Sequence, residues 1–213
     1  MRLAVFSDTH GNLPALEAML GDAGEVDGYI SLGDIVNYGP WSNECVDRIC
    51  GLPNVIKVRG NHDEYFRDGS YPGASALVAE FFDATYPTFT RHATLPTLTE
   101  CYELRGFAFR HTILGQYIYP DTELTLSENV VIGHSHHQFK RESGRHVIYN
   151  AGSVGQNRAY IDVANYLMCE TETMEFECRA LSYDIDVVIQ EMRVRRYPEQ
   201  CIAYYSTKKR LGG

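Results

Sequence analysis

The first sixty residues alternate short apolar segments with amphipathic ones, and this order leaves few possible folds. Apolar runs at 3–7, 28–32 and 54–58 predict strands, and the segments 12–19 and 42–49 between them predict helices. Strand–helix–strand repeats are typical of crossover units in a largely parallel sheet. Because right-handed crossovers bring the carboxyl ends of such strands to one edge, the residues that follow each strand are expected to lie together.

The rest of the chain has a different pattern. Residues 67–96 carry Gly, Pro, Ser and Thr around one helical segment at 75–86, which predicts a cap-like excursion. Turn signals at Arg105-Gly106 and at 170–173 predict hairpins and antiparallel pairing. A closing helix is expected at 184–196, with a polar tail to 213 that frays. The strands expected here are 101–104, 107–110, 130–132, 147–149, 160–168 and 174–180.

The composition is that of an ordinary globular chain. Hydrophobic residues make up 44% and charged residues 22% of the 213 residues, which excludes wholesale disorder. A chain of this length buries roughly 70% of the surface that it exposes when unfolded, so it can form a real core. We expect one α/β domain over residues 1–213, with the cap-like excursion at about 67–96 and a C-terminal helical tail from about 184.

Charge and cysteine usage limit the partners and the location. The formal net charge is −9, from 19 Lys and Arg against 28 Asp and Glu, which argues against general binding to nucleic acid or to anionic membranes. The longest apolar runs are only strand-sized, and the N-terminus has no signal-peptide pattern, so a cytoplasmic location is expected. The six cysteines form no C-x-x-C pair, and we expect free thiols instead of disulfides or a zinc–thiolate site.

Five polar clusters follow predicted strands. Their side chains are carboxylates, imidazoles and a carboxamide, a mixture that suits Mn, Fe, Co, Ni or Zn better than a thiolate site does. In an extended chain, residues i and i+2 point to the same side, so Asp8 with His10, and His134 with His136, can each direct two ligands to one place. Each cluster alone has an ordinary explanation as a turn or a strand end. The clusters are Asp8-Thr9-His10, Gly33-Asp34, Gly60-Asn61-His62-Asp63, His111 and Gly133-His134-Ser135-His136.

This ordered set resembles the calcineurin-like metallophosphoesterase superfamily. The phrases at 7–16 and 150–156 are similar to its small prokaryotic phosphodiesterase branch, which is often described as diadenosine-tetraphosphatase-like. The resemblance runs from residue 1 to about 195. It implies an α/β fold of four layers, in which two facing mixed β-sheets are flanked by helices.

The resemblance also implies a site with two divalent metal ions. Manganese is the expected metal, with Fe, Zn, Co or Ni as alternatives. Asp34 would bridge the ions with its two carboxylate oxygens, and His62 would be a catalytic residue that faces the substrate without binding metal. The first ion would be held by Asp8, His10 and His136, and the second by Asn61, His111 and His134.

The expected reaction is hydrolysis of phosphodiesters or nucleotide polyphosphates. A metal-bound water is acidified toward neutrality, so a hydroxide that bridges the ions can attack phosphorus in line with the leaving group. His62 would stabilise phosphoryl oxygens or donate a proton to the leaving group. The alternatives are a phosphomonoesterase on the same site, acting on proteins or small molecules, and a non-catalytic scaffold. The scaffold is disfavoured because every ligand position is filled.

Several other residues are weaker candidates. His111 is followed by Thr112, where the family usually has glycine, and this side chain would narrow the floor beside the second ion or change its affinity. Asn12 and Asn37 would bind substrate phosphate or cap turns, and Arg158 would contact the substrate. The cap aromatics would stack on a nucleobase or pack on the core, the latter being favoured. The edge strand of either sheet could pair with a second copy of the chain, so a homo-oligomer is an open possibility.

Overall fold

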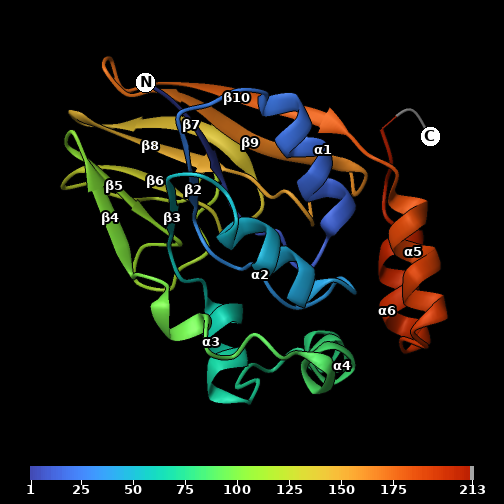
Figure 1. Ribbon diagram of the computed structural model, residues 1–213. Helices are drawn as coiled ribbons and strands as arrows, with labels where there is room; N and C mark the ends of the chain where they lie inside the picture. Colours follow the sequence, from blue (N-terminus) through green and yellow to red (C-terminus); the bar gives the residue numbers. More distant parts are fainter. Residues whose placement is uncertain (212–213) are drawn as a thin grey trace.

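Two five-stranded β-sheets pack face to face in the computed structural model, which describes residues 1–211 (Figure 1). The first sheet has the order β10-β9-β1-β2-β3, and the second has the order β4-β5-β6-β8-β7. The strands of the first sheet are β1 (Arg2–Phe6), β2 (Gly28–Ser31), β3 (Val55–Lys57), β9 (Val163–Glu170) and β10 (Glu175–Ser182). Those of the second are β4 (Cys101–Leu104), β5 (Phe107–Arg110), β6 (Asn129–Ile132), β7 (Gln138–Ser143) and β8 (His146–Ala151).

Each sheet has a parallel centre and antiparallel additions. In the first sheet β2 is parallel to both β1 and β3, whereas β9 is antiparallel to β1 and β10 to β9. In the second sheet β6 is parallel to both β5 and β8, whereas β4 and β7 are antiparallel edge strands. The prediction of two facing mixed sheets with flanking helices is therefore confirmed, although within residues 1–211 the outer face of the second sheet is covered by a non-helical segment.

The central strands are buried on both faces, which explains their continuous apolar sequence. Along β1, Leu3 and Val5 point into the layer between the sheets, where they join Phe109 and Val131 of the second sheet. Ala4 and Phe6 point the other way, into the layer beneath the helices. Because successive side chains of a strand point to opposite faces, this one short strand contributes to two separate hydrophobic cores.

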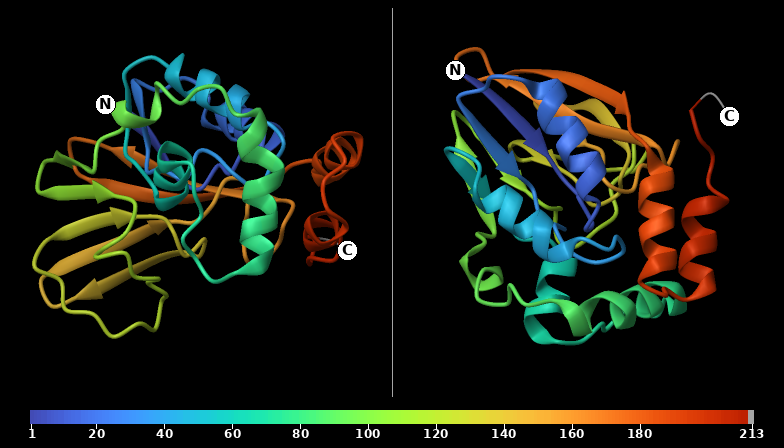
Figure 2. Two further views of the ribbon diagram at one scale, coloured as in Figure 1. Left: turned by 90° about the horizontal axis from the view of Figure 1, so that it is seen from below. Right: turned by 45° about the vertical axis from the view of Figure 1, so that its right-hand side comes forward.

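Helices cover the outer face of the first sheet. The helices α1 (Leu13–Ala23) and α2 (Ser42–Cys50) pack there, and α3 (Asn61–Asp68) follows β3. The cap-like excursion contains α4 (Ala76–Thr85) and two short 3-10 turns (Tyr86–Thr88 and Leu95–Thr97), and α4 packs against α6 (Glu199–Ser206) beside α5 (Ile185–Val194) (Figure 2). The outer face of the second sheet is covered by the non-helical segment 112–128 through Ile118 and Leu126.

Three elements differ from the sequence-based expectation. The strand β7 was not predicted, because its sequence is polar and only Phe139 is buried. The cluster Gly60-Asn61-His62-Asp63, for which a turn is the ordinary explanation, instead begins the helix α3. The tail was expected to fray, but the sequence beyond α5 forms α6, and the backbone carbonyl of Lys209 accepts a hydrogen bond from the Ile161 amide. That prediction is wrong up to residue 211, and residues 212–213 lie outside the described part.

Three further expectations concern membrane-spanning helices, the cysteines and the hairpins. No helix within residues 1–211 has the length and apolar character needed to cross a membrane. All six cysteines are free thiols, as expected. The two predicted hairpins, β4–β5 and β9–β10, are both antiparallel.

Candidate metal centre

The predicted ligand clusters meet where the carboxyl ends of the parallel strands of both sheets converge. The loops after β1 and β2 are joined by a hydrogen bond from the Asp8 amide to the Gly33 carbonyl (3.0 Å), and those after β5 and β6 by one from the Gly133 amide to the His111 carbonyl (3.0 Å). The sequence-based expectation that residues after successive strands lie together is met here, and it applies to both sheets.

Left-handed backbone conformations orient the side chains of five candidate ligands toward the site. Asp8, His10, Asp34, His134 and His136 all have positive φ, between 48° and 68°. Such conformations are uncommon for residues other than glycine and tend to be held in place at functional sites. Asp8 and His10 do point to one place, but they do so through these left-handed conformations, whereas His134 and His136 belong to two different groups of ligands. The extended-strand reasoning used to predict the pairs is therefore wrong.

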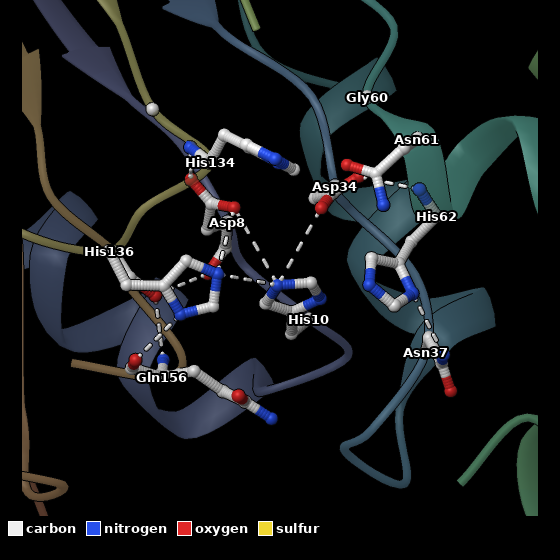
Figure 3. Close-up of polar contacts among 12 residues, drawn as sticks. Asp8, His10, Asp34, Asn37, Gly60, Asn61, His62, His134, His136 and Gln156 are labelled. Atoms are coloured by element: carbon white, nitrogen blue, oxygen red, sulfur yellow. Dashed lines mark hydrogen bonds and ion pairs between the residues drawn. The ribbon is translucent and has the colours of Figure 1, made fainter. Parts of the chain in front are cut away.

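One group of ligands gathers Asp8, His10 and His136 (Figure 3). The Nε2 atoms of the two histidines lie 3.2 Å apart, and Asp8 Oδ1 is 3.6 Å from the Nε2 of His10 and 3.1 Å from that of His136. Each ring is fixed from behind, because Nδ1 donates to a backbone carbonyl: His10 to Val36 (3.2 Å) and His136 to Gln156 (2.8 Å). A neutral imidazole that donates through Nδ1 presents a lone pair at Nε2.

The second group gathers Asp34, His111 and His134. His111 Nδ1 donates to the Leu32 carbonyl (2.9 Å), so its Nε2 faces Asp34 Oδ2 at 3.3 Å and His134 Nδ1 at 3.1 Å. Asn61, the first residue of α3, places its side-chain oxygen 3.1 Å from the same Nε2. All four predicted contributors to the second ion are therefore side by side.

Each carboxylate uses one oxygen for the backbone and leaves the other free for the histidines. Asp8 Oδ2 accepts the His134 amide (2.9 Å), and Asp34 Oδ1 accepts the His62 amide (2.8 Å). The single atom Asp34 Oδ2 then lies 3.8 Å from His10 Nε2 and 3.3 Å from His111 Nε2, between the two groups. The expectation that Asp34 faces the two groups with both of its oxygens is therefore wrong.

These donors fit divalent metal ions. Two lone pairs facing each other at 3.1–3.2 Å repel, unless a proton or a cation lies between them. Two nitrogen ligands about 2.1 Å from one ion are about 3.0–3.4 Å apart in tetrahedral or octahedral geometry. Within residues 1–211, the buried atoms Asp8 Oδ1 and His134 Nε2 have no hydrogen-bond partner, which is costly unless another group satisfies them. The hydrogen bonds from Nδ1 to backbone carbonyls are those that typically orient metal-binding histidines.

The charges of the cluster depend on one another. Burial alone would raise the pKa of a carboxyl, yet the surrounding imidazoles hold the pKa values of Asp8 and Asp34 well below their usual range. Burial lowers the pKa of His134 to about 4. Burial opposes protonation of His111 as well, but the Asp34 carboxylate outweighs it and raises the pKa of His111 to about 10. A metal ion must therefore displace a proton at His111.

His62 lies beside the two groups of ligands, and its Nδ1 atom already has a hydrogen-bond partner in Asn37. Asn37 Oδ1 accepts the Tyr38 amide (2.7 Å), which fixes the orientation of the amide group, and Asn37 Nδ2 therefore donates to His62 Nδ1 (2.9 Å). Burial lowers the pKa of His62 to about 3, so the ring is neutral near pH 7. The proton of the neutral ring is then on Nε2. One nitrogen of His62 also lies within 4.8 Å of possible metal-binding atoms of His10 and Asp34. Distance alone therefore does not show whether His62 binds metal or only faces the substrate.

The weaker candidates have different environments. Asn12 is fully buried, caps α1 by accepting the Ala15 amide (3.1 Å), and donates to Gly155 and Tyr183, so the capping alternative is the one observed. Asn37 is fully buried and contacts His62. Arg158 is exposed and donates to the Tyr204 hydroxyl. The predicted packing of the cap aromatics is confirmed: Phe81, Phe82 and Phe89 are buried in the core, and the partly buried Tyr86 packs against it.

Thr112 lies beside the second group of ligands. It lines a cavity of about 320 Å³ together with Arg59, Asn61 and His111. Its hydroxyl donates to the Gln116 carbonyl within the following loop. This loop carries Tyr117, whose ring stacks on that of His134 with centroids 4.1 Å apart. The residue after His111 thus starts a loop that covers a candidate ligand.

The sequence-based reasoning missed two supporting residues. Asp63 accepts the amides of Gly60 (2.9 Å), Asp34 (2.8 Å) and Ile35 (3.0 Å), and so ties the start of α3 to the loop after β2. Gln156 orients His136 through its backbone carbonyl. Both residues belong to the motifs on which the family resemblance depends. However, Asp34 and Ile35 are far from Asp63 along the chain, and His136 is far from Gln156. Only a knowledge of the fold could have assigned these roles.

This fold and this cluster define a metallophosphoesterase. A family model described as calcineurin-like phosphoesterase matches residues 1–188, and the chain belongs to that family. It is 30% identical to the uncharacterised protein MJ0912 of Methanocaldococcus jannaschii, over 92% of this chain and 94% of that protein. A metallophosphoesterase from Sphaerobacter thermophilus has a similar structure, with a TM-score of 0.79 and 27% identity over 98% of this chain and 99% of that one. The hypothetical protein PH1004 of Pyrococcus horikoshii shares the fold, with a TM-score of 0.77 and 17% identity over 96% and 97% of the two chains.

Proposed function

We propose that the protein is a dinuclear-metal phosphoesterase that hydrolyses phosphodiesters or nucleotide polyphosphates in the cytoplasm. The observation that carries this proposal is the convergence of three Nε2 atoms, each fixed by a hydrogen bond from Nδ1 to a backbone carbonyl, on two buried carboxylates. In this proposal one ion is held by Asp8, His10, Asp34 and His136. The other is held by Asp34, Asn61, His111 and His134, and manganese is the preferred metal.

Two divalent ions would supply an acidified water and positive charge for an anionic phosphoester. The chain supplies the rest of the environment. Asp8 and Asp34 stay ionised because the imidazoles lower their pKa values. The Nε2–H group of His62 is available to donate to a phosphoryl or leaving-group oxygen, because Asn37 occupies the other nitrogen.

Aromatic side chains around the cluster support an organic substituent on the phosphate. Tyr38 contacts the rings of His10 and His62, with centroids 4.7 Å and 5.2 Å away, and Tyr65 contacts His62 at 5.3 Å. Tyr117 covers His134 and is 56% exposed. The half-buried ring of Tyr65 and the exposed ring of Tyr117 can stack on a nucleobase or another planar group, whereas Tyr38 is buried. These contacts favour a phosphodiester or nucleotide over a small phosphomonoester.

The test is hydrolysis of bis(p-nitrophenyl) phosphate and p-nitrophenyl phosphate by metal-stripped protein, reloaded with Mn²⁺, Fe²⁺, Co²⁺, Ni²⁺ or Zn²⁺. We expect Mn²⁺-dependent cleavage of the diester, and at least a hundredfold lower kcat for His62→Ala. His146→Ala is the matched control, because His146 lies in β8 and contacts none of the ligands named here. Cleavage of the monoester alone would indicate a phosphomonoesterase. Absence of turnover with every metal would contradict the proposal and favour a scaffold.

A further inference from the structure

Two cationic side chains share one tyrosine near the metal centre. Arg158, in the loop between β8 and β9, donates from Nη1 to the hydroxyl of Tyr204. Lys208, just after α6, places its Nζ 4.6 Å from the centroid of the same ring. One cation is thus held at the polar end of Tyr204 and the other over its face, which is a recognised cation–π arrangement.

This group of three residues, which we term the basic rim, is linked to the reaction centre. The rings of Tyr204 and Tyr38 are 6.4 Å apart, and Tyr38 is in turn 4.7 Å from the ring of His10. A second link runs through Gln156, whose side-chain oxygen accepts the Tyr204 hydroxyl (3.3 Å) and whose backbone carbonyl orients His136. The basic rim therefore stands at the edge of the site next to the first group of ligands.

The basic rim is held in place by packing. The helix α6 packs against α5 and α4 (Figure 2). Its side chains Cys201, Ile202 and Tyr205 are buried in one cluster with Phe81 of α4. The hydroxyl of Tyr205 also accepts from Gln156 Nε2 (3.1 Å). Tyr204 and Lys208 lie beyond the residues that the family model matches, which end at 188.

The charge pattern of the basic rim points to an anionic ligand. Across residues 1–211, nine arginines form ion pairs with carboxylates. Arg158 and Lys208 are among the cations that form none, and what sets these two apart is their shared contact with Tyr204. Two unpaired cations close together repel each other, and burial together with Arg158 lowers the pKa of Lys208. In a chain of net charge −9, such a pair next to a phosphoester site is best explained by a negative group that both cations bind.

We propose that Arg158, Tyr204 and Lys208 form a subsite for a second phosphate group of the substrate, besides the phosphate that reacts. The substrate class is then a phosphoester with at least two phosphates, such as a nucleoside polyphosphate. This inference rests on the proposed function. The guanidinium of Arg158, oriented by the Tyr204 hydroxyl, binds phosphate oxygens as a planar fork, and Lys208 adds a point charge.

Equilibrium binding tests the subsite without turnover. Calorimetric titration of the Mn²⁺-loaded protein compares α,β-methylene-ADP with AMP, and fructose 1,6-bisphosphate with fructose 6-phosphate. We expect the wild type to prefer α,β-methylene-ADP over AMP by at least tenfold. A preference confined to the fructose pair would indicate a phosphomonoester and contradict the proposed substrate class. Arg158→Gln and Lys208→Gln each reduce this preference about tenfold, whereas Arg158→Lys retains part of it.

The control and the contrary results are distinct. Arg105→Gln removes the same charge at the turn between β4 and β5, and keeps the preference. Equal binding of both members of each pair to the wild type overturns the subsite, as does an equal loss of affinity for mono- and bisphosphates in the variants. Failure of the wild type to hydrolyse any ester refutes the proposed function separately, since the binding preference is measured without hydrolysis.

Discussion

Replacing Asn37 by glycine tests whether a single amide sets the state of His62. Asn37 has a φ of 74°, a conformation that glycine adopts without strain, so Asn37→Gly removes the amide and leaves the backbone relaxed. His62 Nδ1 then loses its donor at 2.9 Å inside a buried site. The ring becomes free to place its proton on Nδ1 and to turn toward other partners. We expect kcat to fall while the metal stays bound.

The size of the effect follows from the lost hydrogen bond. Leaving a buried polar atom unpaired costs about 1–3 kcal/mol. Since each 1.4 kcal/mol is a factor of ten, the population of the productive ring state falls by about 5- to 150-fold. The decrease in kcat is expected in the same range. Thr85→Val is the matched control: it removes one donor to Asn37 Oδ1, but the Tyr38 amide still orients the side chain, so kcat changes by less than about threefold.

Two measurements decide the outcome. Long-range ¹H–¹⁵N spectra of the zinc-loaded protein distinguish the Nε2–H from the Nδ1–H form of His62, and steady-state kinetics with bis(p-nitrophenyl) phosphate give kcat. We expect the wild type to show the Nε2–H form and Asn37→Gly to show a mixture. A variant with unchanged ¹⁵N shifts and a kcat within twofold of the wild type would refute the reasoning, because the amide would then have no influence on the ring.

Three further predictions concern the metal centre and its support. A methyl group at Gly60 would collide with the side chain and amide of Asp34, so Gly60→Ala is expected to lower bound metal by at least half, as measured by plasma mass spectrometry; full occupancy would contradict this. Because the pKa of His111 is about 10 and metal binding displaces its proton, Mn²⁺ affinity is expected to rise about tenfold per pH unit from pH 6 to 8, measured by titration calorimetry; a pH-independent affinity would be the contrary result. Asn12→Ala removes a helix cap and two buried hydrogen bonds, so the free energy of unfolding in urea should fall by about 2–3 kcal/mol, with Asn12→Ser recovering part of it; a change in KM without loss of stability would restore a substrate role.

Local sequence signals predicted much of this fold. The apolar segments of the first sixty residues lie in three parallel strands, and the helical segments between them are α1 and α2. These elements are long or apolar enough for their pattern to dominate. The strand β7 could not be found in this way, because an edge strand buries only one side chain and its pairing depends on β8. The helix α6 was missed for a similar reason: only α4 and α5 show which of its faces is apolar.

The candidate ligands were identifiable because each cluster directly follows an apolar strand. Their residue types and order were enough to propose metal binding and the family, and the family is confirmed. The geometry was less accessible. The sequence contains no sign that Asp8 and His136 take a left-handed backbone, or that one oxygen of Asp34 faces both histidine groups while the other accepts the His62 amide. Thr112 signalled a departure from the family, but its effect on the following loop required the structure.

Sequence alone thus determined which side chains are present at the strand ends, since burial, apolar pattern and residue chemistry are local properties. Tertiary structure decided what each side chain does. Hydrogen bonds between residues that are far apart in sequence, such as those from His10 to Val36 and from His136 to Gln156, choose the nitrogen that each ring presents. The basic rim likewise depends on contact between Arg158 and Tyr204, which lie in different elements. Directional and electrostatic interactions of this kind act over a few ångströms in space, so the order of residues along the chain does not contain them.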